Sequence, residues 1–336
     1  ISIQSMTNVD SRDEEALVKQ IKQLEEAGCE IVRIAIPDFD SAATFKAVKM
    51  RVNLPLVADI HFDYKLALAA IEAGADKVRI NPGNIGDIDK VKAVVLAAKN
   101  RNIPIRVGIN SGSLEKEILK KYGGVTAVGL AESALKNLAI IEYLGYDNLV
   151  VSIKSSSVKM NFDANRILSS KTDYPIHIGV TEAGTIANGR IKSAVGIGGL
   201  LLDGIGNTIR VSLTADPVEE VIFAKEILKT VGLRKTAIGF VSCPTCGRTK
   251  IDLQKLANEI EDKLKPIEEQ RIKEDKPPIK IAVMGCAVNG PGEAAEADFG
   301  VAGGDGKGLI FAKGKIVKTV EENEIVSELI RLIEAK

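Results

Sequence analysis

The chain alternates short runs of β-branched residues with longer segments whose apolar positions recur at helical spacing. The runs are typical of buried parallel strands and cover Ser2–Ser5, Ile31–Ile36, Leu56–Ile60, Lys77–Ile80, Ile103–Ile109, Leu149–Ile153, Ile176–Val180 and Ile209–Leu213. The amphipathic segments between them include Asp13–Ala27, Tyr64–Ala73, Asp89–Lys99 and Ala131–Leu144. Eight strand–helix units in about 230 residues match the usual size of a (β/α)₈ TIM barrel.

A doubly wound sheet is the alternative α/β fold. It would need a switch point in the strand order and usually a Gly-rich first turn, whereas the first turn here is Ser5-Met6-Thr7-Asn8. An internal repeat also favours the barrel, because Glu26–Ile34 and Glu72–Ile80 each join a helix end, a glycine and a strand with one Arg. The sequence therefore predicts a TIM barrel over residues 1–233.

The pattern changes after Val231-Gly232. The segment Asp252–Arg271 predicts one long helix, Ile279–Met284 a strand, Leu309–Val320 a hairpin and Asn323–Ala335 a closing helix. We expect a small α+β domain over residues 234–336, built around three cysteines.

Five cations lie on predicted barrel strands, each next to β-branched residues: Arg33, Arg79, Arg106, Lys154 and Arg210. Side chains alternate between the two faces of a strand, so if Val and Ile face the helices these cations face the barrel interior. Arg is almost never fully buried without a partner, and strand-borne carboxylates are too few to pair with all of them. The pattern predicts a highly anionic ligand, most naturally a diphosphate, at the C-terminal ends of the strands.

Polar residues of the same strand parity extend the predicted substrate site: Asp59, His61, Asn81, Asn110 and Ser212. Taken alone, His61 is more simply a satisfied core histidine. Glu182 ends the seventh predicted strand beside a Gly-containing loop, and it is a candidate general acid or base.

Cys243 and Cys246 form a C-x-x-C pair, and Cys286 follows in a later turn. Three thiolates are one short of a closed tetrahedral zinc site, and the only two histidines lie far upstream. An iron–sulfur cluster held by three thiolates leaves one iron for another ligand, and Glu293 is close enough in sequence to supply it. The alternative is a structural or redox-active C-x-x-C with Cys286 as a buried thiol.

The composition excludes several functional classes. The 45 basic and 45 acidic residues cancel, and aromatic residues make up 4% with no Trp, so neither nucleic acid nor an anionic membrane is expected as a partner. No apolar run approaches the roughly 18 residues that span a bilayer, and no signal peptide opens the chain. We expect a cytoplasmic protein with reduced thiols.

The connection between the two domains predicts a homodimer. The last barrel helix, from Pro217 to about Thr230, returns the chain to the bottom of the barrel, away from the cations. About ten residues then lead to Cys243, a reach of at most ~35 Å. We therefore expect the cysteine domain of one subunit to cap the barrel of a partner in a head-to-tail homodimer.

Several long motifs resemble the family of bacterial 4-hydroxy-3-methylbut-2-en-1-yl diphosphate synthases, which act in the non-mevalonate isoprenoid pathway. The resemblance runs from Gln4-Ser5-Met6-Thr7-Asn8 to the C-terminus. Its motifs are Val57–Asp63, Arg79–Gly86, Gly179–Gly184, Arg210–Leu213, Cys243–Cys246 and Cys286–Glu293.

The resemblance implies a 4Fe-4S cluster on Cys243, Cys246 and Cys286, with Glu293 on the fourth iron. It implies 2-C-methyl-D-erythritol 2,4-cyclodiphosphate as the substrate and reduced ferredoxin or flavodoxin as the electron donor. In this reading Glu182 protonates the departing hydroxyl group, and Asn289 reaches the substrate from the cluster side.

Two other functions remain open at this point. The first is a barrel transferase resembling dihydropteroate synthase, with zinc bound by the cysteines. The second is an iron–sulfur carrier or sensor whose barrel only binds a small ligand.

Overall fold

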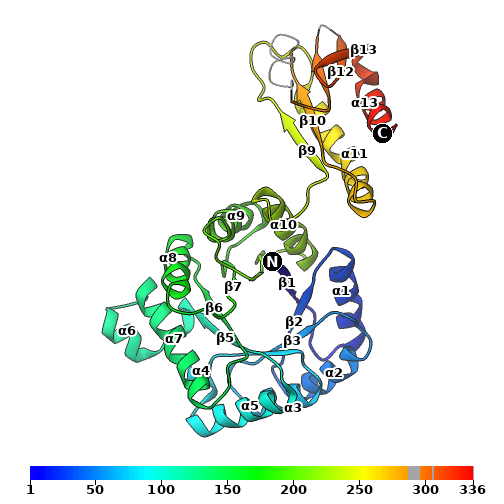
Figure 1. The fold of residues 1–336 in the computed structure, drawn as a ribbon. Helices are drawn as coiled ribbons and strands as arrows, with labels where there is room; N and C mark the ends of the chain where they lie inside the picture. Colours follow the sequence, from blue (N-terminus) through cyan, green and yellow to red (C-terminus); the bar gives the residue numbers. More distant parts are fainter. Residues whose placement is uncertain (287–295, 305, 336) are drawn as a thin grey trace. The chain divides into compact units, whose positions relative to one another are not determined.

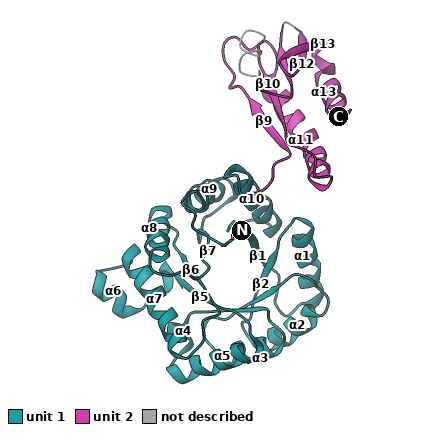
Figure 2. Ribbon diagram, viewed as in Figure 1, with its two compact units in different colours: residues 1–233 teal, residues 234–336 magenta. Residues whose placement is uncertain are grey.

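The computed structural model describes residues 1–286, 296–304 and 306–335. The chain divides into two compact units, Ile1–Leu233 and Arg234–Lys336, which Figure 2 shows in different colours. Each unit has its own apolar core. Within the described ranges, none of the helices combines the length and the apolar character that a membrane crossing needs.

The first unit is a TIM barrel, seen along its axis in Figure 1, and this confirms the predicted fold class. Its parallel strands are β1 (Ser2–Met6), β2 (Ile31–Ala35), β3 (Leu56–Asp59), β4 (Lys77–Ile80), β5 (Ile105–Asn110), β6 (Leu149–Lys154), β7 (His177–Ile178) and β8 (Thr208–Ile209). They are paired in the order β6-β5-β4-β3-β2-β1-β8-β7. A parallel bridge between Val151 and Ile176 joins β6 to the β7 side and completes the ring.

The helices form an outer ring around these strands (Figure 1). They are α1 (Glu14–Glu26), α2 (Phe39–Lys49), α3 (Tyr64–Glu72), α4 (Pro82–Ile85), α5 (Ile88–Arg101), α6 (Lys116–Tyr122), α7 (Ala127–Tyr143), α8 (Val158–Ser169), α9 (Ile186–Leu202) and α10 (Pro217–Thr230). Several begin at an Asp cap, as where Asp13 accepts from the backbone N–H of Ala16. In α10 an Asp216 cap precedes Pro217, whose fixed φ suits the first helical turn.

Strand alternation separates an apolar layer from a polar interior. Val32 and Ile34 of β2 are fully buried in the apolar core that the strands share with the helices. Arg33, between them, points the other way and lines a cavity inside the barrel. The same alternation on β4 buries Val78 in the core and directs Arg79 into that cavity.

The last two strands of the barrel are shorter than the sequence predicts. We expected strands over Ile176–Val180 and Ile209–Leu213, whereas β7 and β8 contain two residues each. Gly179 lies so close to the next strand that a Cβ there would be 2.5 Å from the carbonyl oxygen of Arg210. The chain therefore leaves regular pairing at this point and opens into the loops of the site.

The second unit is one mixed sheet with its helices packed on it. Its strands are β9 (Ile238–Ser242), β10 (Ile279–Met284), β11 (Phe299–Gly303), β12 (Lys307–Ala312) and β13 (Lys315–Glu321). They follow one another in the sheet, with β9, β10 and β11 parallel and the last two pairs antiparallel. Helices α11 (Leu253–Lys273) and α13 (Ile325–Glu334) supply apolar side chains to its core. The short strands β9 and β11 are absent from the predicted elements.

Candidate active site

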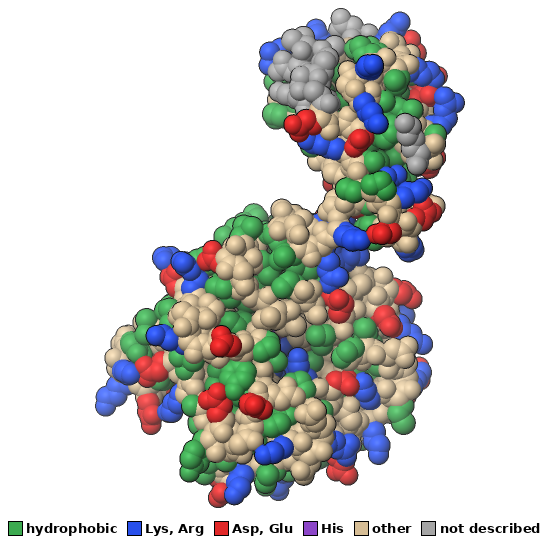
Figure 3. Space-filling view, viewed as in Figure 1, with side chains coloured by type: hydrophobic (Ala, Val, Ile, Leu, Met, Phe, Trp, Pro, Cys, Tyr) green, Lys and Arg blue, Asp and Glu red, His purple; other side chains and the backbone are tan. Residues whose placement is uncertain are grey.

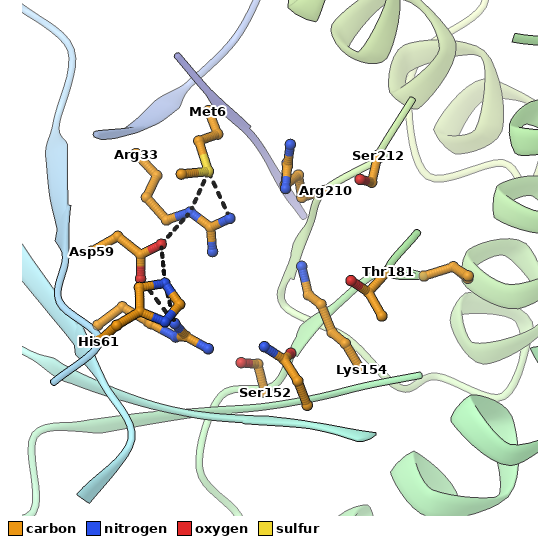
Figure 4. A pocket seen from close by; sticks show the side chains of 12 residues that line it. Met6, Arg33, Asp59, His61, Ser152, Lys154, Thr181, Arg210 and Ser212 are labelled. Carbon is orange, nitrogen blue, oxygen red and sulfur yellow. Dashed lines mark hydrogen bonds and ion pairs between the residues drawn. The ribbon is translucent and has the colours of Figure 1, made fainter. Parts of the chain in front are cut away.

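Four cations line one cavity at the carboxyl ends of the barrel strands. The cavity has a volume of about 170 Å³, and Figure 4 shows its lining side chains. Arg33, Arg79 and Lys154 come from β2, β4 and β6, Arg210 directly follows β8, and all four reach the cavity. In Figure 3 a small patch of basic side chains is visible at the centre of the barrel face. Because the strands of a TIM barrel carry its active site at this end, the cavity is the candidate active site.

Asp59, at the end of β3, joins two of these cations. Its Oδ1 accepts from Arg79 Nη1 at 3.0 Å, and its Oδ2 lies 3.6 Å from Arg33 Nε. His61 Nε2 lies 3.5 Å from the same Oδ2, and the group is drawn together in Figure 4. Burial alone would raise the pKa of Asp59, but the Arg33 charge, the His61 hydrogen bond and the neighbouring arginines hold it below 3.8. Asp59 is therefore an ionised carboxylate that orients Arg33 and Arg79.

Arg210 has a carboxylate partner that sequence reasoning missed. Glu220 of α10 is buried, and its oxygens lie 3.3 and 3.4 Å from Arg210 Nη2. The same carboxylate accepts from Ser5 Oγ at 3.2 Å and from the backbone N–H of Leu213 at 2.9 Å. These contacts hold Arg210 against the wall of the cavity.

Lys154 is buried on β6, and its ammonium group contacts an imidazole. Its Nζ lies 3.1 Å from Nε2 of His177, which is fully buried on β7. Burial, and then the charges of the surrounding arginines, hold the pKa of Lys154 well below 10.5. A bound anion would favour the ammonium form and relieve this repulsion.

Arg106 differs from the other four predicted cations because it lines neither cavity described in this section. It is 1% exposed, and its Nη1 donates to Gln4 Oε1 at 2.8 Å inside the barrel. Burial, and then the charges of Arg33 and Arg79, hold its pKa well below 12.5. Its charge still adds to the positive field, because it is among the charges that act on Asp59 and Lys154.

Two glycines make room for the long cationic side chains. A Cβ at Gly108 would lie 2.4 Å from Arg79 Nε, and one at Gly179 would lie 3.1 Å from Lys154 Nζ. Both glycines follow the strand parity of inward-facing residues, so a missing side chain leaves space that a neighbouring cation fills.

Replacing Gly108 with Ala is expected to displace Arg79 and weaken anion binding by up to about 100-fold. Arg79 cannot move aside freely, because Asp59 and the Gly108 carbonyl oxygen already fix its guanidinium group. Calorimetric titration with inorganic pyrophosphate measures the effect. Gly198→Ala in α9 is the matched control, because its new Cβ would meet only ordinary contacts at 3.8 Å or more. Equal affinities in the two variants would show that Arg79 is not needed for binding.

A wider cavity of about 930 Å³ adjoins the first and shares His61, Arg79, Asn110 and Thr181 with it. Asn81 lines this outer cavity, and its side chain also caps α4 by accepting from the Gly83 backbone N–H at 3.1 Å.

Glu182 lines the outer cavity with an exposed side chain. Its φ of 51° places a non-glycine residue in the left-handed region. Such strain is often found at functional sites, where the surrounding structure enforces it.

The remaining predicted residues divide between the two cavities. Ser212 lines the inner cavity, and Asn110 borders both. Four further lining residues of the inner cavity were not predicted: Met6, Ser152, Val180 and Thr181. Met6 accepts from Arg33, with Nη2 and Nε at 2.9 and 3.2 Å from its sulfur. Strand alternation could have predicted that Met6 and Ser152 face the barrel interior. Neither was selected, because neither side chain is charged.

The cysteines of the second unit lie at the carboxyl ends of two neighbouring strands. Cys243 follows β9, and its backbone N–H donates to the carbonyl oxygen of Val283 in β10 at 3.2 Å. The N–H of Gly285, one residue before Cys286, donates to Cys243 Sγ at 3.2 Å. Parallel pairing of β9 and β10 therefore brings the C-x-x-C turn beside the turn of the third cysteine.

Cys246 is exposed and lies in a turn in which the backbone N–H of Thr249 donates to the carbonyl oxygen of Cys246 at 3.0 Å. Its N–H donates to Thr249 Oγ1 at 3.1 Å. Hydrogen bonds from the backbone and then the side chain of Arg248 hold the pKa of the Cys246 thiol below 9.0. A lowered pKa favours the thiolate, which is the form that binds a metal.

Three soft donors with an N–H···S contact fit an iron–sulfur cluster, because such hydrogen bonds tune its sulfurs. Within residues 1–286, 296–304 and 306–335, no three His, Cys, Asp or Glu side chains are already grouped as for a metal ion. The predicted residues Glu293 and Asn289 lie outside the described residues. The fit therefore rests on the three thiols alone.

Comparison with protein-family profiles matches both units. Residues 1–225 match the GcpE TIM-barrel domain, and residues 239–335 match the GcpE protein C-terminal domain. Three similar curated proteins are all named 4-hydroxy-3-methylbut-2-en-1-yl diphosphate synthase (flavodoxin). The one from Clostridium perfringens is 58% identical over 99% of this chain and 93% of its own length. Those from Caldanaerobacter subterraneus and Geobacillus kaustophilus are 57% and 58% identical over 99% and 98% of this chain, and over 92% and 86% of their own lengths.

Solved structures with a similar fold are more distant. Yersinia pestis dihydropteroate synthase, in complex with a sulfonamide drug, superposes with a TM-score of 0.50. The match covers 69% of this chain and 92% of the other, at 11% identity. At this identity the likeness shows a shared barrel fold and carries no statement about a shared reaction.

Proposed function

Since the chain belongs to the GcpE family through both its barrel and its C-terminal domain, we propose that it converts 2-C-methyl-D-erythritol 2,4-cyclodiphosphate to (E)-4-hydroxy-3-methylbut-2-enyl diphosphate. The reaction opens the cyclic diphosphate by C–O cleavage, eliminates water and consumes two electrons. It is a step of isoprenoid biosynthesis, and the protein is an oxidoreductase.

The charge balance of the barrel interior is the observation that supports this substrate best. Five buried or half-buried cations face two carboxylates, Asp59 and Glu220, which leaves three positive charges in excess. An inorganic or organic diphosphate carries a comparable negative charge. Arg forks and a Lys point charge are the groups that proteins commonly use to hold phosphate oxygens.

Carboxylates orient three of the arginines for phosphate binding. Asp59 fixes the planes of Arg33 and Arg79, and Glu220 fixes Arg210, so these forks are oriented before the substrate arrives. Pre-oriented groups lose little conformational entropy on binding. The diphosphate ring is thereby held in the inner cavity, and its carbon skeleton is directed toward the wider outer cavity.

We infer that Cys243, Cys246 and Cys286 bind a 4Fe-4S cluster, with Glu293 as the ligand of the fourth iron. When bound, such a cluster supplies the two electrons one at a time. The Gly285 N–H group stabilises negative charge on Cys243 Sγ, and the Arg248 hydrogen bonds do the same for Cys246. On this proposal Asn289 contacts the substrate from the cysteine side.

Glu182 is the proposed acid for the departing hydroxyl group. It lines the outer cavity, where the carbon skeleton would lie, and its backbone is held in a strained conformation. Backbone strain of this kind is often concentrated at active sites, which supports a functional role for this turn. Asn81 and His61 line the same cavity and can hold the substrate oxygens nearby.

The electron donor is proposed to be reduced flavodoxin, which the names of the relatives from three organisms include. Ferredoxin is the alternative low-potential donor. Turnover measured with each purified donor at equal concentration separates the two. We expect the reaction to take place in the cytoplasm.

We also propose that the two units act in a head-to-tail homodimer, in which the cysteines of one subunit serve the barrel of its partner. The proposal rests on the short connection, since α10 ends at Thr230 and β9 begins at Ile238. In a closed two-fold dimer each complete site would then contain one barrel and one cysteine domain from different chains.

Mixing two inactive variants tests this arrangement. Cys243→Ser removes a cluster ligand, and Lys154→Met removes a cation from the cavity, so each is expected to be inactive alone. After unfolding and refolding an equal mixture, random pairing would give about a quarter of the wild-type activity, because half the dimers regain one of two sites. No activity above that of the separate variants would show that each site forms within one chain.

The function itself is tested by an anaerobic assay with the cyclic diphosphate and reduced flavodoxin. Formation of the linear allylic diphosphate, with two electrons consumed per product, is the expected result. A reconstituted protein that binds the substrate but never forms this product would contradict the proposal.

A further inference from the structure

His177 is buried inside the barrel and is not among the residues assigned above to the substrate or the cluster. It is 0% exposed on β7, next in register to Thr208 of β8. Its Nδ1 lies 2.8 Å from Thr208 Oγ1, and its Nε2 lies 3.1 Å from Lys154 Nζ. Both ring nitrogens are therefore engaged, one by a hydroxyl group and one by a cation of the cavity.

The protons of this chain of contacts can be assigned when an anion occupies the cavity. An ammonium group has only donors, so Nε2 of His177 must accept from Lys154. A neutral imidazole carries one proton, which then resides on Nδ1 and is donated to Thr208 Oγ1. Burial, and then the charges of Lys154, Arg106, Arg33 and Lys77, hold the pKa of His177 well below 6.5. The ring therefore stays neutral at physiological pH.

Lys154 differs from the arginines of the site in the charge of its partner. Arg33 and Arg79 share Asp59, and Arg210 contacts Glu220, so part of their charge is already balanced. The hydrogen-bond partner of Lys154 is a neutral ring. A neutral acceptor orients the ammonium group without cancelling its charge.

We propose that His177 is a positioning residue for the diphosphate site, fixed by Thr208 as the Nδ1–H tautomer so that Nε2 holds Lys154 toward the ligand. The inference rests on the proposed function for the identity of the ligand. The geometry of the three side chains does not depend on it.

Nitrogen NMR of histidine-labelled protein tests the tautomer directly, since His61 and His177 are the only two histidines of the chain. In the presence of inorganic pyrophosphate, one histidine is expected to remain neutral with its proton on Nδ1 from about pH 5.5 to pH 8. A His177→Gln variant assigns that signal by its disappearance. A proton on Nε2, or a doubly protonated ring in this range, would overturn the proposal.

Matched substitutions test the consequence for binding. Thr208→Val keeps the shape but removes the hydroxyl group, and it is expected to weaken pyrophosphate binding about tenfold. Thr208→Ser keeps the acceptor and should bind nearly as the wild type does. His177→Leu should lose at least as much affinity as Thr208→Val, whereas His177→Gln restores an acceptor for Lys154 and should recover most of the loss.

A merely structural role for His177 predicts another outcome. Both His177 variants would then lower the free energy of unfolding while pyrophosphate affinity, KM and kcat stayed equal between them, and this would contradict the proposal. Failure of the wild type to turn over the cyclic diphosphate would affect only the proposed function, because the tautomer and the pyrophosphate titration are measured without catalysis. If His177→Leu does not fold, the Thr208→Val and Thr208→Ser variants and the NMR signal still test the proposal.

Discussion

Cys243→Ser is expected to lower turnover of the cyclic diphosphate more than about 100-fold and to remove most of the bound iron. Loss of an outer partner of a metal ligand typically lowers affinity or activity 10- to 100-fold, and loss of a ligand itself should exceed that. Ser keeps the size of the side chain but replaces a soft thiolate by a hydroxyl group that does not ionise near neutral pH. Iron content, the visible spectrum and the anaerobic rate measure the effect.

The buried thiol of the barrel provides the matched control. Cys29 is 3% exposed, and its Sγ lies 3.1 Å from the carbonyl oxygen of Ile31. Burial raises the pKa of Cys29 to about 11, so it remains a thiol and is not a metal ligand. Cys29→Ser should therefore keep full iron content and activity. A Cys243→Ser enzyme that retains both its iron and its rate would refute the assigned ligand set.

Lys154→Met is expected to separate stability from activity. Removing one partner of a buried charged contact with a ligand typically weakens it by about 2–5 kcal/mol, which is at least a 30-fold fall in kcat/KM. No buried carboxylate is left unpaired, and the loss of a hydrogen bond to the neutral Nε2 of His177 should cost folding about 1–3 kcal/mol. Removing the Lys154 charge also relieves its burial cost and its repulsion by the neighbouring arginines, which offsets that loss.

Lys77→Met is the control for the general loss of a barrel cation. Lys77 is half-buried on β4, and burial, then the charge of Arg106, lowers its pKa to about 8. It lines neither cavity of the site, so this variant should keep wild-type kcat/KM. An equal loss in the two variants would mean that overall positive charge, rather than the position of Lys154, determines activity.

Strand parity was sufficient to predict which barrel residues face inward. The period of two is strict where a strand is paired on both sides, and so Arg33 and Arg79 point away from the helices that bury Val32 and Val78. The family resemblance and the TIM barrel are confirmed by the matched domains.

Parity does not give the depth of a residue inside the barrel. Arg106 is paired in register with Arg79 and has the expected direction, but it contacts Gln4 instead of lining a cavity. Gly108 is the next inward position after Arg106 on β5. The guanidinium group of Arg79, from β4, extends over this glycine. Only the three-dimensional packing of these side chains distinguishes a cation that reaches the cavity from one beneath it.

The sequence pattern also does not predict the hydrogen-bond partners that other helices and strands supply to the site cations. Glu220 lies in the first turn of an amphipathic helix, where a charged residue is normally solvated, yet it is 3% exposed and contacts Arg210. From the sequence alone, His177 is only a histidine too distant from the cysteines to complete a zinc site. Its role in the barrel follows from contacts with β6 and β8, which no local pattern encodes.

Anaerobic purification followed by a visible spectrum and iron and sulfide analysis tests the central claim most directly. About four irons and four sulfides per chain, with a brown colour that dithionite bleaches, is the result that the three-thiolate cluster predicts. A colourless protein that contains one zinc, even after reconstitution with iron and sulfide, would contradict it. The barrel would then be a diphosphate-binding site without the redox centre that the proposed reaction requires.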